Sequence, residues 1–168
     1  LQRTGGGAPP LVAVKGGSSA VLVDNSIRGG GVASVLVQGT AQISGNRFFG
    51  AGGKQGSAIW VWDKSTVLVS GNQFTGYRNA LNASGSDVTA TDNVISKFNG
   101  PASVGRKPSA PPRVSGNTAF SQNQKDSAAK VEGARAAEDN VLKKPDETGV
   151  SSSKWQSLWP KKQPEGPW

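Results

Sequence analysis

The sequence contains no cysteine, no histidine and no methionine. Without cysteine there is no disulfide framework, and without cysteine and histidine there are no metal sites built from those ligands. The absence of histidine also excludes histidine acid–base catalysis and every Ser-His or Cys-His catalytic arrangement. Several classes of enzyme are therefore excluded, but the lack of cysteine identifies no cellular compartment.

Long apolar runs are also missing, and only 35% of the 168 residues are hydrophobic while 23 are glycine. No run approaches the ~20 apolar residues that a membrane-spanning helix needs, and no signal peptide is visible. The composition predicts a narrow core spread along a stack of repeats, in a chain of one domain's length. Because the first residue is Leu1, in "LQRTGGGAPP", we expect the sequence to be a fragment or a processed product of a longer protein.

The net charge is +8, from 19 Lys and Arg against 11 Asp and Glu. Such a charge favours anionic partners over cationic ones. It does not by itself indicate nucleic acid, because the basic residues are scattered and no nucleic-acid-binding motif occurs. The stretches "RGGGVA" and "GAGGKQG" lack the spacing of phosphate-binding loops, so we expect them to be ordinary loops and we expect no cofactor.

A short phrase centred on asparagine recurs along the chain. Its six copies read "VLVDNSI", "QISGNRF", "VLVSGNQF", "TATDNVI", "RVSGNTAF" and "RAAEDNVL". Their asparagines are Asn25, Asn46, Asn72, Asn93, Asn117 and Asn140. The spacings of 21, 26, 21, 24 and 23 residues are typical of a repeat architecture.

Three further positions of the phrase are constrained. The third residue before each asparagine is apolar: Leu22, Ile43, Val69, Ala90, Val114 and Ala137. The residue immediately before it is glycine or aspartate: Asp24, Gly45, Gly71, Asp92, Gly116 and Asp139. The second residue after it is again apolar: Ile27, Phe48, Phe74, Ile95, Ala119 and Leu142. Chance does not readily produce three constrained columns in six copies.

Each copy follows a segment with strand-like alternation, such as "ASVLVQGT" or "AIWVWDKS". One repeat is therefore predicted to be a strand, a short turn, a second strand, a tight bend, an inward apolar residue and a variable loop. Stacked copies would pair their strands in parallel about 4.8 Å apart. Asn, Asp and Gly tolerate the left-handed conformation of a sharp bend, and stacked asparagines can form a hydrogen-bonded ladder.

This phrase, with its period in the low twenties, resembles the right-handed parallel β-helix of pectate-lyase-like and carbohydrate-binding, sugar-hydrolase-associated repeat proteins. The resemblance covers roughly residues 11–144 and implies an all-β solenoid of about six coils. It also implies an extracellular or periplasmic location. The hexapeptide period of a left-handed solenoid is not found. Because this fold carries many activities, the resemblance leaves the function open.

The two ends differ from the repeats. Residues 1–10 are too short and too rich in Gly and Pro to cap a stack. We expect the stack to start in upstream sequence or in a strand that another chain supplies. Residues 145–168 form a basic tail rich in Trp and Pro. In one interpretation Val150, Trp155, Leu158 and Trp159 fold over the last coil as a cap; in the other the tail docks on an anionic partner or a membrane surface.

The stretch "SAIWVWDKS" contains two of the five tryptophans. Alternation predicts that Ile59 and Val61 point inward, and that Trp60 and Trp62 point outward on one flat face. Two exposed tryptophans are costly unless something covers them. Aromatic faces stack well on sugar rings, so one interpretation is a polysaccharide platform; the other is that protein covers the pair, either the tail or another domain.

Polar residues are expected around this pair. Alignment of the coils places Leu36 and Gln38 on one side of the tryptophans, and Ala80 and Asn82 on the other. The predicted ligand-binding set is Trp60, Trp62, Gln38, Tyr77, Arg78 and Asn82.

Evidence for catalysis is thin. Asp24, Asp92 and Asp139 belong to the bend column, which accounts for them structurally. Asp63 and Asp87 remain as weak catalytic candidates near the tryptophans, and glycoside hydrolysis would need such a pair. No acid-dense segment offers the oxygen ligands of a calcium site, so no metal is expected.

The sequence leaves three functions open. The first is a non-catalytic β-helix module of a larger protein that binds polysaccharide or a protein on the tryptophan face. The second is the C-terminal part of a β-helix polysaccharide lyase, hydrolase or epimerase. The third is a structural spacer or a trimeric fibre segment.

Overall fold

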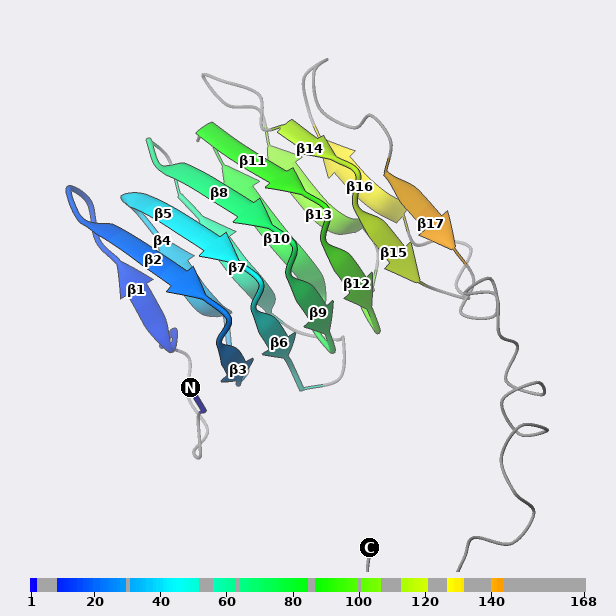
Figure 1. Cartoon of the computed structure of the whole chain (residues 1–168), viewed down its shortest axis with the longest axis horizontal. Coiled ribbons are helices and arrows are strands. Elements are labelled where there is room, and N and C mark those ends of the chain that lie inside the picture. The colour runs from blue at the N-terminus through cyan, green and yellow to red at the C-terminus, as the bar shows by residue number, and fades with distance from the viewer. Residues whose placement is uncertain are drawn as a thin grey trace, which may run out of the picture.

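The computed structural model describes residues 1–2, 9–29, 31–51, 56–62, 64–84, 87–99, 101–106, 113–120, 127–131 and 140–143. All the regular secondary structure in these residues is β-strand. The strands stack as successive coils, each coil rising over the one before it (Figure 1). The predicted all-β solenoid is thus confirmed.

The first five coils each contain three strands. They are β1 (Val12–Val14), β2 (Ser19–Val23) and β3 (Ser26–Arg28); β4 (Ala33–Val37), β5 (Thr40–Ser44) and β6 (Arg47–Phe49); β7 (Ser57–Val61), β8 (Thr66–Ser70) and β9 (Gln73–Thr75); β10 (Asn79–Ser84), β11 (Asp87–Thr91) and β12 (Val94–Ser96); and β13 (Pro101–Arg106), β14 (Arg113–Ser115) and β15 (Thr118–Phe120). Only β16 (Ser127–Val131) and β17 (Val141–Lys143) follow in the described residues. The expectation of about six coils is therefore slightly too high for this part of the chain.

Three parallel sheets run along the stack. Sheet I has the order β1-β4-β7-β10-β13-β16, sheet II the order β2-β5-β8-β11-β14, and sheet III the order β3-β6-β9-β12-β15-β17. Every strand pairs with its counterpart in a neighbouring coil; for example, Ile43 of β5 lies opposite Leu22 of β2 and Val69 of β8. Side chains at one position of the repeat are therefore neighbours along the stack.

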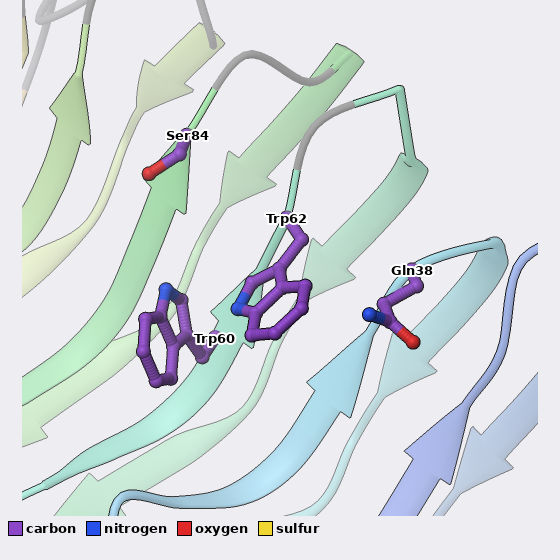
Figure 2. A pocket seen from close by; sticks show the side chains of 4 residues that line it. All are labelled: Gln38, Trp60, Trp62 and Ser84. Atoms are coloured by element: carbon purple, nitrogen blue, oxygen red, sulfur yellow. The ribbon is translucent and has the colours of Figure 1, made fainter.

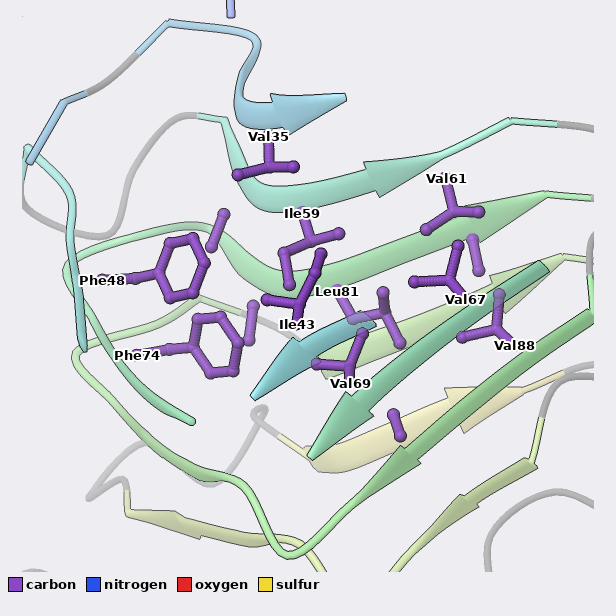
Figure 3. Close-up of a cluster of buried hydrophobic side chains, with 14 of the residues drawn as sticks. Val35, Ile43, Phe48, Ile59, Val61, Val67, Val69, Phe74, Leu81 and Val88 are labelled. Carbon is purple, nitrogen blue, oxygen red and sulfur yellow. The ribbon is translucent and has the colours of Figure 1, made fainter. Parts of the chain in front are cut away.

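The core is a narrow column between the three sheets. Sheet III contributes Ile27, Phe48, Phe74, Ile95 and Ala119, the apolar residues expected two positions after the asparagines, and all are buried. The rings of Phe48 and Phe74 stack with centroids 4.8 Å apart and an interplanar angle of 24° (Figure 3). The last member of the column, Leu142, is 39% exposed because it lies on the edge strand β17.

The asparagines form the expected ladder. The Oδ1 atom of each asparagine from Asn46 onward accepts the backbone N–H of the asparagine one coil earlier, at 2.8–3.2 Å. It also accepts that residue's Nδ2, at 2.8–3.1 Å. Each Nδ2 from Asn46 onward also donates to a backbone carbonyl of the preceding coil, such as Ile43 O for Asn72, at 2.8 Å. Asn46, Asn72, Asn93 and Asn117 are buried.

The residue before each of the first five asparagines has a left-handed backbone. The φ angles are 57° for Asp24, 66° for Gly45, 62° for Gly71, 56° for Asp92 and 66° for Gly116. Only Gly, and less readily Asp or Asn, adopts this conformation at low cost, which explains the composition of the column. Asp139, its sixth member, lies outside the described residues.

Replacing Asn72 by alanine should lower the free energy of unfolding by about 2–4 kcal/mol, because several buried polar groups lose their partners at about 1–3 kcal/mol each. Asn25→Ala is the matched control at the edge of the ladder, where Asn25 is only partly buried, and it should cost about 1 kcal/mol. Urea denaturation measures both. Equal losses in the two variants would contradict the account of a buried ladder.

Candidate functional site

Trp60 and Trp62 point outward from β7, as the alternation predicts. Ile59 and Val61 are fully buried, Trp60 is half-buried and Trp62 is 41% exposed. The two indole rings lie 5.6 Å apart between centroids, at 75° to each other. They form an edge-to-face pair, so the surface is an angled recess and not the flat platform that was expected.

The register of sheet I places the neighbours of this pair. Trp60 lies opposite Leu36 of β4 and Asn82 of β10. Val61, the residue before Trp62, lies opposite Val37 of β4 and Ala83 of β10. The residues that follow these two partners are Gln38 and Ser84, which therefore lie on either side of Trp62.

The side chains of Gln38, Trp60, Trp62 and Ser84 line a depression of about 290 Å³ (Figure 2). Ser84, which the sequence analysis did not include, lies where the alignment of the coils put Asn82, and Asn82 lies where it put Ala80. Ala80 is buried and lies outside the depression. The predicted neighbours on the β10 side of the tryptophan pair were therefore displaced by two residues.

Asn82 lies beside Trp60 with an unusual polar atom. Its Oδ1 is shielded from solvent and accepts no hydrogen bond, and no other side-chain polar atom of the described residues is both buried and unpaired. Such an acceptor is destabilising unless a partner reaches it. Asn82 thus lies next to Trp60, and its Oδ1 has no hydrogen-bond partner among the described residues.

Two other predicted residues do not join the depression. Arg78 is exposed, but it precedes Asn82 by four residues, which is about 13 Å along a strand. Asp87 is exposed at the start of β11, opposite Thr66 in sheet II. Asp63 lies outside the described residues, as does the tail of residues 145–168.

Neither a metal site nor a membrane span is found in the described part of the chain. These residues contain no group of three or more Asp or Glu side chains that could hold a metal ion. None of their elements is a helix long and apolar enough to cross a membrane.

Comparison with known proteins agrees with the geometry. A family model described as "Right handed beta helix region" matches residues 10–158. The chain belongs to the right-handed β-helix family. Neither the curated proteins nor the solved structures gave a significant match. Membership of this β-helix family accounts for the stacked coils but assigns no activity.

Tyr77 lies inside this β-helix, not on the tryptophan face where it was predicted. Its side chain is 3% exposed, and its hydroxyl lies 2.9 Å from Ser34 Oγ. Burial raises the pKa of the phenol above its ordinary value of 10.0, and the hydrogen bond with Ser34 acts in the opposite direction. One sequence signal indicated that Tyr77 is buried. Phe98 follows Asn93 by five residues, as Tyr77 follows Asn72, and it is also aromatic and also buried.

The single tyrosine of the sequence can be titrated selectively. We expect its phenolate absorbance at 295 nm to rise with a midpoint above pH 10 in the native β-helix, because burial disfavours the charged form. In denaturant the midpoint should fall to about 10.

The same shift makes stability depend on pH. The stability that neutral Tyr77 contributes to the folded state is fully present below about pH 10. It is lost as the pH rises through the higher pKa that Tyr77 has in the folded state. Tyr77→Phe should abolish the titration and reduce the alkaline loss of stability. A native midpoint at or below that in denaturant would contradict the assigned burial.

Proposed function

We propose that this β-helix module binds a polysaccharide in the depression lined by Gln38, Trp60, Trp62 and Ser84. The observation that carries the proposal is the angled tryptophan pair, half-buried at Trp60 and exposed at Trp62, with an amide and a hydroxyl side chain beside it. The apolar C–H face of a sugar ring can lie on an indole ring, while its hydroxyls need polar partners. The Gln38 amide can both donate and accept such hydrogen bonds.

The setting of Trp62 favours a glycan over a protein partner. A protein interface typically buries about 800 Å² on each side around an apolar centre. Trp62, directly after β7, is the exposed large hydrophobic side chain of this depression, while Trp60 is half-buried. One exposed indole in a small depression supports binding of a narrow ligand better than docking of a broad apolar surface.

The proposal contains no catalytic step. Hydrolysis of a glycosidic bond by the usual route needs two carboxyl groups that flank the bond. Asp87 belongs to sheet II, whereas both tryptophans belong to sheet I or follow it directly. Binding without cleavage is therefore the function that these residues support best.

A binding experiment tests the proposal directly. The 168-residue chain is incubated with immobilised cellulose, chitin, xylan and polygalacturonate and with a glycan array. At least one should retain it, and Trp62→Ala should weaken that binding at least about tenfold, the equivalent of 1.4 kcal/mol. Leu68→Ala is the matched control, because Leu68 is also partly exposed but lies on sheet II, and it should bind as the unchanged protein does.

Two results would refute polysaccharide binding at this site. One is the absence of binding to every glycan by a folded chain. The other is binding that Trp62→Ala and Leu68→Ala weaken equally. Retention of a protein partner that depends on Trp62, without any glycan binding, would replace the proposal with a protein-docking role.

A further inference from the structure

A second depression lies on the outer face of sheet III, which is a different sheet from that of the tryptophans. It has a volume of about 220 Å³ and spans β6, β9 and β12, the neighbouring third strands of coils two to four (Figure 1). These strands have paired strands on both sides, β3 before them and β15 after them. The outward side chains that line the depression are Arg47, Phe49, Gln73, Thr75, Val94 and Ser96.

The register arranges these six side chains in two rows across the sheet. One row is Arg47, Gln73 and Val94, and the other is Phe49, Thr75 and Ser96. Neighbours within a row are about 4.8 Å apart, and the rows are about 7 Å apart along the strands. All six side chains are therefore close enough to contact one small ligand.

The polar side chains of this depression have no partners in the described part of the chain. Neither a side-chain hydrogen bond nor an ion pair with another described residue is formed by Arg47, Gln73, Thr75 and Ser96. The guanidinium, the amide and both hydroxyls can donate hydrogen bonds. The described lining includes no carboxylate. It thus offers several donors and a positive charge to a ligand that accepts hydrogen bonds.

A second arginine borders the depression. Arg28 of β3 lies opposite Phe49, and its guanidinium carbon is 4.3 Å from the centroid of the Phe49 ring. This cation–π contact holds the guanidinium of Arg28 beside a side chain that lines the depression. Two positive charges are therefore available on this part of sheet III.

The described acids do not neutralise these two arginines. The described residues include three acids, namely Asp24, Asp87 and Asp92. Asp87 belongs to sheet II. Asp24 and Asp92 belong to the bend column, and neither forms an ion pair with either arginine. The charge of the depression is therefore complementary to an anion.

We propose that this depression binds a phosphate monoester. Such a group carries a charge of about −1.5 to −2 at pH 7 and has three strongly accepting oxygens. The planar fork of the Arg47 guanidinium matches two of these oxygens. The Gln73 amide and the Thr75 hydroxyl can donate to the third, and Arg28 supplies the second positive charge.

The lining favours a phosphate ester over a carboxylate. A carboxylate has one charge and two oxygens, which the fork of Arg47 alone would match. The remaining donors and the second arginine would then have no charged acceptor. Phe49 and Val94 can cover the carbon skeleton of an ester. The volume is below the roughly 300–1,000 Å³ of pockets for drug-sized ligands, so the depression suits a single sugar phosphate.

Nuclear magnetic resonance titration of the 168-residue chain tests the site, with inorganic phosphate and glucose 6-phosphate as the probes. Both should give saturable amide shifts in β9 and β12. Arg47→Gln should weaken the binding at least about tenfold, because the charge-assisted hydrogen bonds are lost. Lys15→Gln is the matched control: it also removes one positive charge, but Lys15 is exposed in the turn after β1, outside sheet III. This variant should bind as the unchanged protein does.

Two further sugars separate the phosphate from the rest of the ligand. Glucose has no anionic group and should cause no shifts in β9 and β12. Glucuronate carries a single carboxylate and should bind at least about tenfold more weakly than glucose 6-phosphate, because it offers less charge and fewer oxygens.

Four results would overturn the proposal. They are the absence of binding by both phosphate probes, equal weakening by Arg47→Gln and Lys15→Gln, glucuronate binding as tight as that of glucose 6-phosphate, and binding of inorganic phosphate alone. The second would reduce the effect to net charge, and the last would make the free ion the ligand. Trp62→Ala should leave phosphate binding unchanged, so the result is independent of glycan binding at the tryptophans.

Discussion

The asparagine ladder is the interaction on which the rest of this β-helix depends. Each interior side chain accepts two hydrogen bonds from the coil before it and donates to the next rung and to a backbone carbonyl, as Asn72 does with Asn46, Asn93 and Ile43. Because these groups are buried, every coil must place its bend at the same point of the stack. The ladder therefore sets the register of the apolar columns that form the core.

The same constraint separates structure from function. An asparagine held by four hydrogen bonds, with a left-handed Gly or Asp before it and a buried apolar residue after it, has no group left for a ligand. Ligand contacts must come from positions that differ between coils. Trp60 of β7 and Trp62, the residue directly after this strand, are at such positions. The proposed glycan site therefore follows from a departure from the repeat.

The sequence predicts the ladder, the bend column and the outward direction of the tryptophans, because each depends on local spacing along one coil. It predicts the contacts between coils less well. The first strand ends at Val61 and the second begins at Thr66 in the coil of the tryptophans, but in the next coil these bounds are Ser84 and Asp87. An alignment of the coils that does not know this difference misplaces the residues of β10 relative to β7, which is why Ser84 was missed.

The other differences also have physical causes. Tyr77 lies on a loop by its sequence context, but its ring is buried and its hydroxyl finds Ser34, which is 43 residues away in the chain. The 75° angle between the indoles depends on side-chain rotamers and packing, which a period-two pattern does not describe.

Amide hydrogen exchange at Asn72 and Asn93 tests the central claim most directly. Their backbone N–H groups donate to the next asparagine's Oδ1 at 3.0 Å in a buried ladder. The account predicts that these two amides exchange only when the whole stack unfolds, with a protection that matches the free energy of unfolding from urea denaturation. Exchange at the rate of an exposed loop amide would contradict it.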